Sequence, residues 1–377
     1  MSYHVPQWSS DDATAPPAVM CNVAIRKAMA TAASYDFVIP ADRIAQRPRP
    51  FGSQKLLVYR KATRGIEHTT FEALPSLLTP GDLLVLNDTR VVPAQVRLTT
   101  PIDGCVSLLF LDPLRAEHTS MDVLLSAPLP LGTTLSLPEG LTFRVDTLVG
   151  GVPEVHTGTL FGLTHEPLHT YLARVGEMPL PPYVARVPDK EDEAAYQTSV
   201  ANTPGAIAAP TAGLHFYPAL LQQLSDAGID HVCVTLHVGY GTFRSFASEF
   251  VEQHRMDRER YHVSSATRAA IRKARAEGRR VIAVGTTATR VLETIGAGFD
   301  DASTAPLEGE SGIFIYPPYT FQVLNGLFTN FHYPKTSVLT LTAAFCGSQE
   351  ALLDTIYKEA MDKEYLWYSY GDGMLVL

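Results

Sequence analysis

The stretch GAIAAPTAGLHF, residues 205–216, contains no charged residue and decides how the rest of the chain is interpreted. Its small residues follow neither the two-residue period of a strand nor the three-to-four-residue period of a helix. Such a run predicts backbone that comes close to another group. The run ends near His215, and histidine is the side chain whose unperturbed pKa lies nearest to neutral pH. Directly after it, residues 218–228 predict a helix that begins with proline and ends at glycine. The residues alone leave a plain glycine-rich connector as the alternative.

The composition is that of an ordered chain with more than one domain. Its 377 residues are long for one domain and suit two. Hydrophobic residues make up 46% and charged residues 18%, which excludes a disordered protein. No apolar run reaches the roughly 18 residues of a membrane helix, and the first residues lack the pattern of a secretory signal. We therefore expect a cytoplasmic protein with no membrane partner.

Several familiar sites are missing from the sequence. The four cysteines are too far apart for a CxxC pair, a zinc pattern or a disulfide framework, so we interpret them as buried thiols. There is no HExxH motif and no GxxxxGK[ST] loop, and the GYGTFR segment at Gly239 lacks the third glycine of a dinucleotide fingerprint. No metal and no resident cofactor are expected.

The charge is unevenly distributed. The net charge of −9 argues against nucleic acid, yet residues 22–64 and residues 254–290 each carry +7, which leaves −23 for the rest. Two basic segments in an acidic protein predict a local phosphate-binding face. The alternative is a solvated helix face, which residues 268–280 would fit.

The chain falls into three predicted parts. Residues 1–33 are polar and aperiodic, which predicts a disordered N-terminal extension. Residues 34–87 and 165–377 alternate strands and helices, which predicts a discontinuous α/β catalytic domain. Residues 88–164 hold short apolar runs at roughly ten-residue spacing with turn residues between them, which predicts a β-barrel. The predicted fold class is therefore α/β, with a β-barrel domain inserted into an α/β main domain.

Six polar clusters are hard to explain as core. They are LNDTRVVPA (86–94), PLPPY (179–183), TLHVGYGTF (235–243), VGTTATR (284–290), TNFHYPK (329–335) and YSYGDGM (368–374). Any one of them fits a turn or a hydrogen-bonded core group. Six of them in one α/β chain indicate a shared cleft.

With these clusters the chain resembles the S-adenosylmethionine:tRNA ribosyltransferase-isomerase family of queuosine biosynthesis. The matching stretches run from about residue 35 to the end and include IAQRP, LLVLNDTRVVPA, MPLPPY, YQT, AAPTAGLHF, VTLHVG, RVIAVGTT, TNFH and SYGD. The resemblance implies transfer of the ribosyl part of S-adenosylmethionine to a 7-aminomethyl-7-deazaguanine in the tRNA anticodon, with adenine and methionine released. The implied partners are tRNA and S-adenosylmethionine, which is a co-substrate, and the protein is expected to be a monomer.

The resemblance also implies residues for each role. The candidates for general base and acid are His215, His237, His332, Asp88 and Asp372. The candidates for S-adenosylmethionine binding are Pro210, Thr211, Gly213 and Phe216, next to adenine, and Gly285, Thr286 and Thr287, where a helix N-terminus suits the methionine carboxylate. The candidates for contact with the tRNA or with a carboxylate are Arg47, Arg49, Arg90, Tyr183, Arg290, Asn330 and Lys335.

The chain departs from the family at several positions. Gln95 stands where a basic residue is usual, Asp257 where histidine is usual and Tyr240 where alanine is usual, and residues 126–132 of the barrel carry no charge. These departures predict less tRNA contact at the barrel and a narrower pocket at Tyr240. Two alternatives remain open: a paralogue that binds tRNA or S-adenosylmethionine without completing the transfer, and a hydrolase that uses Ser or Thr with His215. No GxSxG motif supports the hydrolase.

Overall fold

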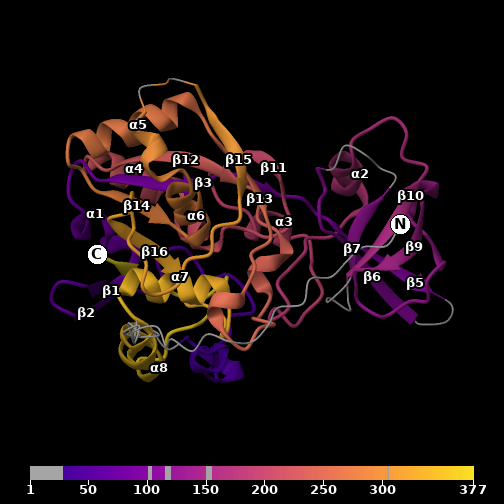
Figure 1. Cartoon of the computed structure of the whole chain (residues 1–377), viewed down its shortest axis with the longest axis horizontal. Helices are drawn as coiled ribbons and strands as arrows, with labels where there is room; N and C mark the ends of the chain where they lie inside the picture. The colour runs from indigo at the N-terminus through magenta and orange to yellow at the C-terminus, as the bar shows by residue number, and fades with distance from the viewer. Residues whose placement is uncertain (1–28, 101–103, 115–119, 150–154, 302, 304) are drawn as a thin grey trace, which may run out of the picture.

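Two sheets divide the molecule. The computed structural model describes residues 29–100, 104–114, 120–149, 155–301, 303 and 305–377. A nine-stranded sheet flanked by helices lies on the left of Figure 1, and a six-stranded antiparallel sheet lies on the right. Within the described residues, no helix combines the length and the apolarity that crossing a membrane requires.

The nine-stranded sheet is mixed, with parallel strands at its centre. Its strands are β1 (Lys55–Arg60), β2 (Gly65–Thr70), β3 (Leu83–Asn87), β12 (Asp230–Leu236), β13 (Glu259–Val263), β14 (Val281–Val284), β15 (Leu307–Ser311), β16 (Gly326–Asn330) and β17 (Gly373–Val376). Their order is β15-β13-β12-β3-β14-β16-β17-β1-β2, and β12, β3, β14 and β16 run parallel. Because β3 is buried along its whole length, it has the continuous apolar sequence typical of a central parallel strand.

Helices cover both faces of this sheet. They are α1 (Leu74–Leu77), α4 (Pro218–Asp226), α5 (Ser265–Ala276), α6 (Thr286–Ile295), α7 (Ser337–Cys346) and α8 (Lys358–Asp362). Successive residues of a strand point to opposite faces, so Leu57 and Tyr59 of β1 join one core while Leu56 and Val58 join the other. Residues of α5, α6 and α7 share the first core, and residues of α1 and α4 share the second. The predicted α/β layer is confirmed.

The six-stranded sheet has a hydrophobic core of its own. Its strands are β5 (Gln95–Thr100), β6 (Gly104–Phe110), β7 (Met121–Leu125), β8 (Thr134–Ser136), β9 (Thr142–Leu148) and β10 (Val155–Phe161), in the order β5-β6-β7-β10-β9-β8. Met121, Val123 and Leu125 alternate with less buried residues along β7 and face this core. Leu168 and Leu172 of α2 (Leu168–Val175) pack into the same core. The antiparallel sheet curls into the barrel-like unit that the short apolar runs predicted, so the fold class is confirmed.

Two short elements run between these units. Strands β4 (Thr89–Val91) and β11 (Thr203–Ala206) form a two-stranded parallel sheet, and α3 (Asp192–Ala195) lies between the six-stranded sheet and β11 in sequence. The bounds of the predicted domains, 34–87, 88–164 and 165–377, stay a prediction. What the structure fixes is that every strand of the second sheet lies between Gln95 and Phe161.

The N-terminal extension is described only in part. Residues 1–28 lie outside the described residues. The next residues are held in place, because the Ala30 N–H donates to the Glu252 carboxylate at 3.0 Å and the Ala32 N–H donates to the Glu249 carbonyl at 2.8 Å. Residues 30–33, which we expected in the disordered extension, are therefore attached to residues 249–252.

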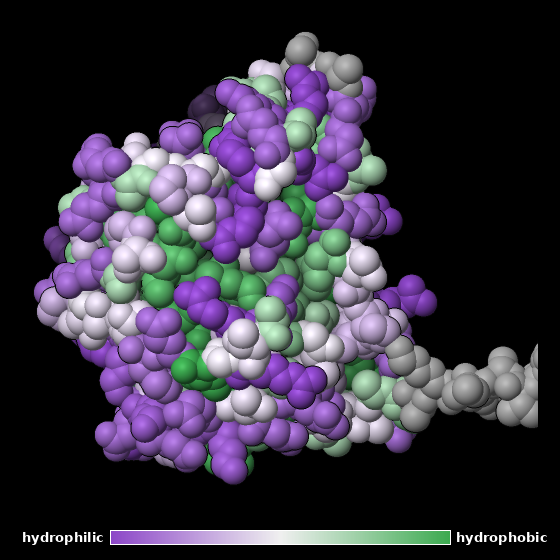
Figure 2. All heavy atoms as spheres, turned by 90° about the vertical axis from the view of Figure 1, so that its left-hand side faces the viewer, coloured by the Kyte–Doolittle hydropathy of each residue, from purple (hydrophilic) through white to green (hydrophobic). Residues whose placement is uncertain are grey.

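The far end of the nine-stranded sheet has a different surface. Figure 2 views the end of the molecule that carries the C-terminus and β2. Hydrophobic residues are recessed there in a hollow, and hydrophilic residues surround them. The carboxyl ends of the central parallel strands lie at the opposite end of the sheet, and residues there line a pocket.

Candidate functional site

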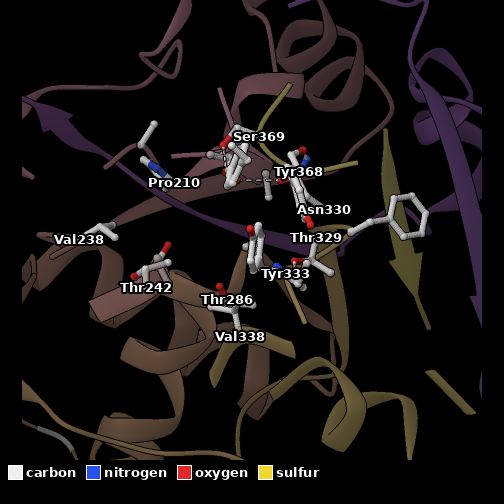
Figure 3. Close-up of a pocket in the computed structure, with 18 residues that line it drawn as sticks. Pro210, Val238, Thr242, Thr286, Thr329, Asn330, Tyr333, Val338, Tyr368 and Ser369 are labelled. Carbon is white, nitrogen blue, oxygen red and sulfur yellow. Dashed lines mark hydrogen bonds between the residues drawn. The ribbon is translucent and has the colours of Figure 1, made fainter. Parts of the chain in front are cut away.

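A pocket lies at the carboxyl ends of the central parallel strands. It is lined by Val238 just after β12, by Gly285 directly after β14 and by Asn330 at the end of β16. Pro210 and Ser369 lie on one side of it, and Thr286 and Val338 on the other (Figure 3). Its lining surrounds about 580 Å³ of space, part of which is open to solvent. Open α/β sheets bind ligands at this edge.

The run at residues 205–216 forms one wall of the pocket. After β11 it turns into a 3₁₀ helix, Thr211–His215, and Pro210 and Thr211 line the pocket. Gly213 does not line it. A Cβ added at Gly213 would come within 2.8 Å of the Thr198 side chain, so this glycine allows close packing inside the protein. Phe216 also lies away from the pocket, 1% exposed in the core against Phe328.

Asn330 connects three parts of this wall. The Thr211 hydroxyl donates to the Asn330 Oδ1 at 3.0 Å. The Asn330 Nδ2 donates to the Tyr368 carbonyl at 3.2 Å and lies 3.0 Å from the His215 Nε2. Because the amide NH₂ faces a carbonyl, the His215 Nε2 must be the acceptor of this bond, and the imidazole proton sits on Nδ1. The sequence placed Asn330 and His215 in different roles, and the structure joins them.

His215 is held as a neutral ring. Its side chain is buried and stacks on Phe71, with ring centroids 4.2 Å apart. Burial, helped by the charge of Arg49, lowers the pKa of His215 to about 3. Its basic nitrogen already accepts a hydrogen bond from Asn330. His215 therefore forms a wall of the site, with no free lone pair for a substrate proton.

The other two candidate histidines have different surroundings. His332 lines the pocket, and its Nε2 lies 2.8 Å from the Thr329 hydroxyl. Burial lowers the pKa of His332 to about 3, and no partner for its Nδ1 is found among the described residues. His237 does not line the pocket; its Nδ1 lies 2.9 Å from the Thr89 hydroxyl. Burial and, second, the charge of Arg260 lower the pKa of His237 to about 4.

Three tyrosines stack on one another at the pocket. Tyr183 and Tyr368 have ring centroids 4.4 Å apart, and Tyr368 and Tyr333 have centroids 4.9 Å apart. Tyr368 adopts a φ of 70°, a conformation that bulky residues rarely take and that occurs preferentially at functional sites. Burial raises the pKa of Tyr183 and Tyr368, so their phenols stay protonated at neutral pH. Only Tyr183 was predicted. Tyr333 and Tyr368 lie inside clusters that the sequence singled out for other residues, and the aromatic residues within these clusters were the available signal.

The N-terminus of α6 supplies the polar side of the pocket. Gly285 precedes this helix with a φ of 93°, which a residue with a Cβ rarely adopts. Gly285, Thr286 and Thr287 line the pocket as predicted candidates, and the Asn87 Nδ2 donates to the Thr287 hydroxyl at 3.1 Å. Among the described residues that line the pocket, none is Asp, Glu, Lys or Arg. The helix N-terminus is therefore the main source of positive potential there.

The two candidate carboxyl groups lie outside the pocket lining. The Thr235 hydroxyl donates to the Asp88 carboxylate at 2.6 Å, and burial raises the pKa of Asp88. Asp372 is fully buried and accepts the N–H groups of Lys55 and Leu366, each at 2.7 Å, together with the Arg49 guanidinium. Asp372 therefore holds Arg49 and the end of the chain in place.

The candidate cations are scattered around the pocket. Arg290 is buried and pairs with Glu259 between α6 and β13. Lys335 pairs with Asp36 at 2.5 Å. Arg90 is exposed on β4. Arg47, half exposed, pairs with Asp189 at 2.6 Å, and Arg49 pairs with Asp372. None of these side chains lines the pocket.

Residues 268–280, which are part of the second basic segment, have their cations engaged. Every Lys and Arg of residues 268–280 bonds to a carboxylate or a backbone carbonyl of the protein. Arg280 pairs with Asp82, which directly precedes β3, so it lies at the end of the sheet opposite the pocket. The alternative was a solvated helix face, and these residues form a helix face whose cations bond within the protein, which describes them better than a phosphate-binding face.

Three of the departures from the family meet at another cavity, which Asp257 does not line. Gln95, Ser126 and Tyr240 line a cavity between the six-stranded sheet and the PLPPY segment. Tyr240 does not line the pocket at the strand ends, so it does not narrow that pocket.

Comparison with known proteins assigns the chain to a family. Residues 32–376 match the family described as "Queuosine biosynthesis protein". The chain belongs to this family. Among curated proteins, this queuosine biosynthesis protein is 42% identical over 346 residues to "S-adenosylmethionine:tRNA ribosyltransferase-isomerase" of Anaeromyxobacter sp. (strain Fw109-5), a match that covers 91% of this chain and 97% of the relative. The protein of the same name from Gloeobacter violaceus is also 42% identical, over 347 residues, with 91% and 95% covered.

A solved structure has the same fold. The crystal structure of S-adenosylmethionine tRNA ribosyltransferase from Thermotoga maritima matches with a TM-score of 0.52 and 29% sequence identity. The match covers 91% of this chain and 100% of that chain. The resemblance that the motifs suggested is thus confirmed for the queuosine biosynthesis protein family.

Proposed function

We propose that the chain transfers and isomerises the ribosyl moiety of S-adenosylmethionine onto 7-aminomethyl-7-deazaguanine at the tRNA wobble position. The reaction gives epoxyqueuosine-tRNA and releases adenine and methionine. One observation of the structure carries the proposal: an uncharged pocket that combines three stacked tyrosines with the N-terminus of a helix. The names of the curated relatives support it.

The pocket suits the chemistry of S-adenosylmethionine. The faces of Tyr333 and Tyr368 suit a sulfonium cation and a flat adenine, since aromatic faces attract cations and stack on bases. The N-terminus of α6 at Thr286 suits the methionine carboxylate. We assign contact with the adenine to the backbone at Pro210 and Thr211, because both residues line the pocket.

His332 is our choice for the general base. A sulfonium acidifies the hydrogens on the adjacent 5′ carbon, so the reaction needs an acceptor for one of them. His332 lines the pocket, and its Nδ1 accepts a proton in the tautomer whose Nε2–H donates to the Thr329 hydroxyl at 2.8 Å. His215, whose Nε2 accepts from Asn330, positions the wall beside it.

The remaining parts of the proposal concern partners. The tRNA binds through its anticodon loop, and the protein works as a monomer in the cytoplasm. S-adenosylmethionine is consumed as a co-substrate, and no metal or further cofactor takes part. Asp88 has no part in this proposal, since it lies outside the lining of the pocket.

Adenine release is the test. Purified protein is mixed with S-adenosylmethionine and tRNA that carries the deazaguanine precursor, and adenine is measured by liquid chromatography. We expect adenine and modified tRNA in equal amounts. Binding of both substrates with no adenine would favour the non-catalytic paralogue, and hydrolysis that needs no tRNA would favour the hydrolase.

A further inference from the structure

A second chamber lies behind the wall of the pocket. Its lining includes Arg49, Phe51, Gln197, His215, Ser369 and Tyr370 and surrounds about 870 Å³ of space, part of which is open to solvent. We propose that this chamber binds an unpaired nucleobase of the substrate tRNA, stacked on Phe51, next to the base that reacts. The proposal rests on the proposed function for the identity of the RNA.

Phe51 is the first observation behind it. Its side chain is 63% exposed, although it is a large apolar group. It stacks on Tyr217, with ring centroids 4.8 Å apart and planes at 29°. Tyr217 thus packs against the Phe51 ring, and most of the Phe51 side chain remains exposed to solvent. Single-stranded RNA is bound by such platforms, because every base has a face that stacks on an aromatic ring.

The charge of the chamber is the second observation. Among the described residues that line it, Arg49 is the one cation and no side chain is a carboxylate. Buried Asp372 fixes the Arg49 guanidinium, and the Arg49 Nε is buried without a hydrogen-bond partner in the described part of the chain. Arg47 lies two residues away and is half exposed, although Asp189 and Glu191 pair with it. This arrangement suits a base that carries a phosphate beside it.

The third observation is continuity with the pocket. Ser369 lines both spaces. His215 lines the second chamber, and Asn330, its hydrogen-bond partner at 3.0 Å, lines the pocket. A ligand in one space is therefore separated from a ligand in the other by a single pair of side chains. Neighbouring nucleotides are covalently joined, so a space that shares Ser369 with the pocket fits the RNA better than a separate small molecule.

The test measures RNA binding without turnover. An RNA hairpin with the anticodon loop and the deazaguanine precursor is titrated with wild type, Phe51→Ala and Phe51→Trp, and fluorescence anisotropy gives the Kd. We expect Phe51→Ala to weaken binding about tenfold, the scale of one lost stacked base. Phe51→Trp, which keeps an aromatic face, should stay within about threefold of wild type. The Kd for S-adenosylmethionine, measured by calorimetry, should not change.

Phe161→Ala is the matched control. Phe161 is another exposed phenylalanine, 43% exposed on β10 of the six-stranded sheet. The Phe161→Ala variant should bind the hairpin with the Kd of wild type. Equal affinity of wild type and Phe51→Ala would overturn the proposal, and so would a loss confined to S-adenosylmethionine. This test measures binding, and the test of the proposed function measures adenine release. If the wild type binds the hairpin through Phe51 but releases no adenine, the proposed function is refuted and this inference still holds.

Discussion

The two spaces on either side of the His215–Asn330 pair differ in charge. The pocket at the strand ends is lined by tyrosines, threonines and a helix N-terminus, with no charged side chain among its described lining residues. The second chamber holds Arg49 and opens beside the exposed ring of Phe51. The difference fits two ligands of opposite charge. A cationic co-substrate is bound by aromatic faces, and a polyanion is bound where a guanidinium is fixed.

The largest expected effect concerns the pocket alone. His332→Ala should lower the rate of adenine release by about a hundredfold or more, because a general base typically contributes that much. Binding of S-adenosylmethionine and of the RNA hairpin should persist. Single-turnover kinetics with saturating tRNA measure the effect.

His231 supplies the control for this substitution. It is an exposed histidine on β12, away from the pocket lining. His231→Ala should keep the wild-type rate. If the rate of adenine release by His332→Ala lies within threefold of wild type, the general base is another group. The assignment of different roles to the two spaces would then lose support.

The second effect concerns the wall itself. Asn330→Ala removes the partner of the Thr211 hydroxyl and of the His215 Nε2, while the Tyr368 carbonyl keeps its bond from the Gly371 N–H at 3.0 Å. Each unmet buried polar group costs roughly 1–3 kcal/mol, so the free energy of unfolding should fall by about 3 kcal/mol. Urea denaturation measures it.

Asn325→Ala is the comparison. Its Oδ1 accepts one bond, from the Val281 N–H at 2.9 Å, and the side chain is exposed. Its loss should cost clearly less than that of Asn330. Equal losses would mean that the wall is no more than ordinary packing.

The third effect is a pH dependence of stability caused by His215. Its pKa is about 3 in the folded protein and 6.5 ordinarily. Below pH 6.5 the unfolded chain binds a proton that the folded chain excludes, so acid destabilises the fold. The contribution of His215 between pH 8 and pH 5 should be about 2 kcal/mol.

His215→Gln tests this contribution, since glutamine is neutral and can accept from Asn330. Its free energy of unfolding should fall less than that of wild type as the pH drops from 8 to 5. Parallel pH profiles would show that His215 is protonated in the folded protein after all.

The smallest expected effect is on the salt dependence of RNA binding, and it distinguishes the two basic segments. Arg47→Gln should reduce the dependence of log K for RNA on log salt by about one unit, as one lost phosphate contact does. Its exposed pair with Asp189 costs little to break. Arg272→Gln, among residues 268–280, whose cations are all engaged, should leave the slope unchanged. The reverse result would place the RNA on α5. Arg49 is unsuitable for this test, because its loss leaves buried Asp372 without its cation.

The sequence alone determined the family and the fold class. Continuous apolar runs such as residues 83–87 identify central strands, and alternating runs such as residues 121–125 identify the second sheet, because side-chain period follows from backbone geometry. The six polar clusters predicted a shared cleft, and residues of five of them line the pocket at the carboxyl ends of the parallel strands.

Tertiary structure alone decided the roles within the site. Three histidines looked equal in sequence, but only the fold puts His332 in the pocket and gives the Nε2 of His215 to Asn330. Two basic segments carried the same charge, but only packing pairs every cation of residues 268–280 with an acceptor. Contacts between residues far apart in sequence set protonation and pairing, and no local pattern records them.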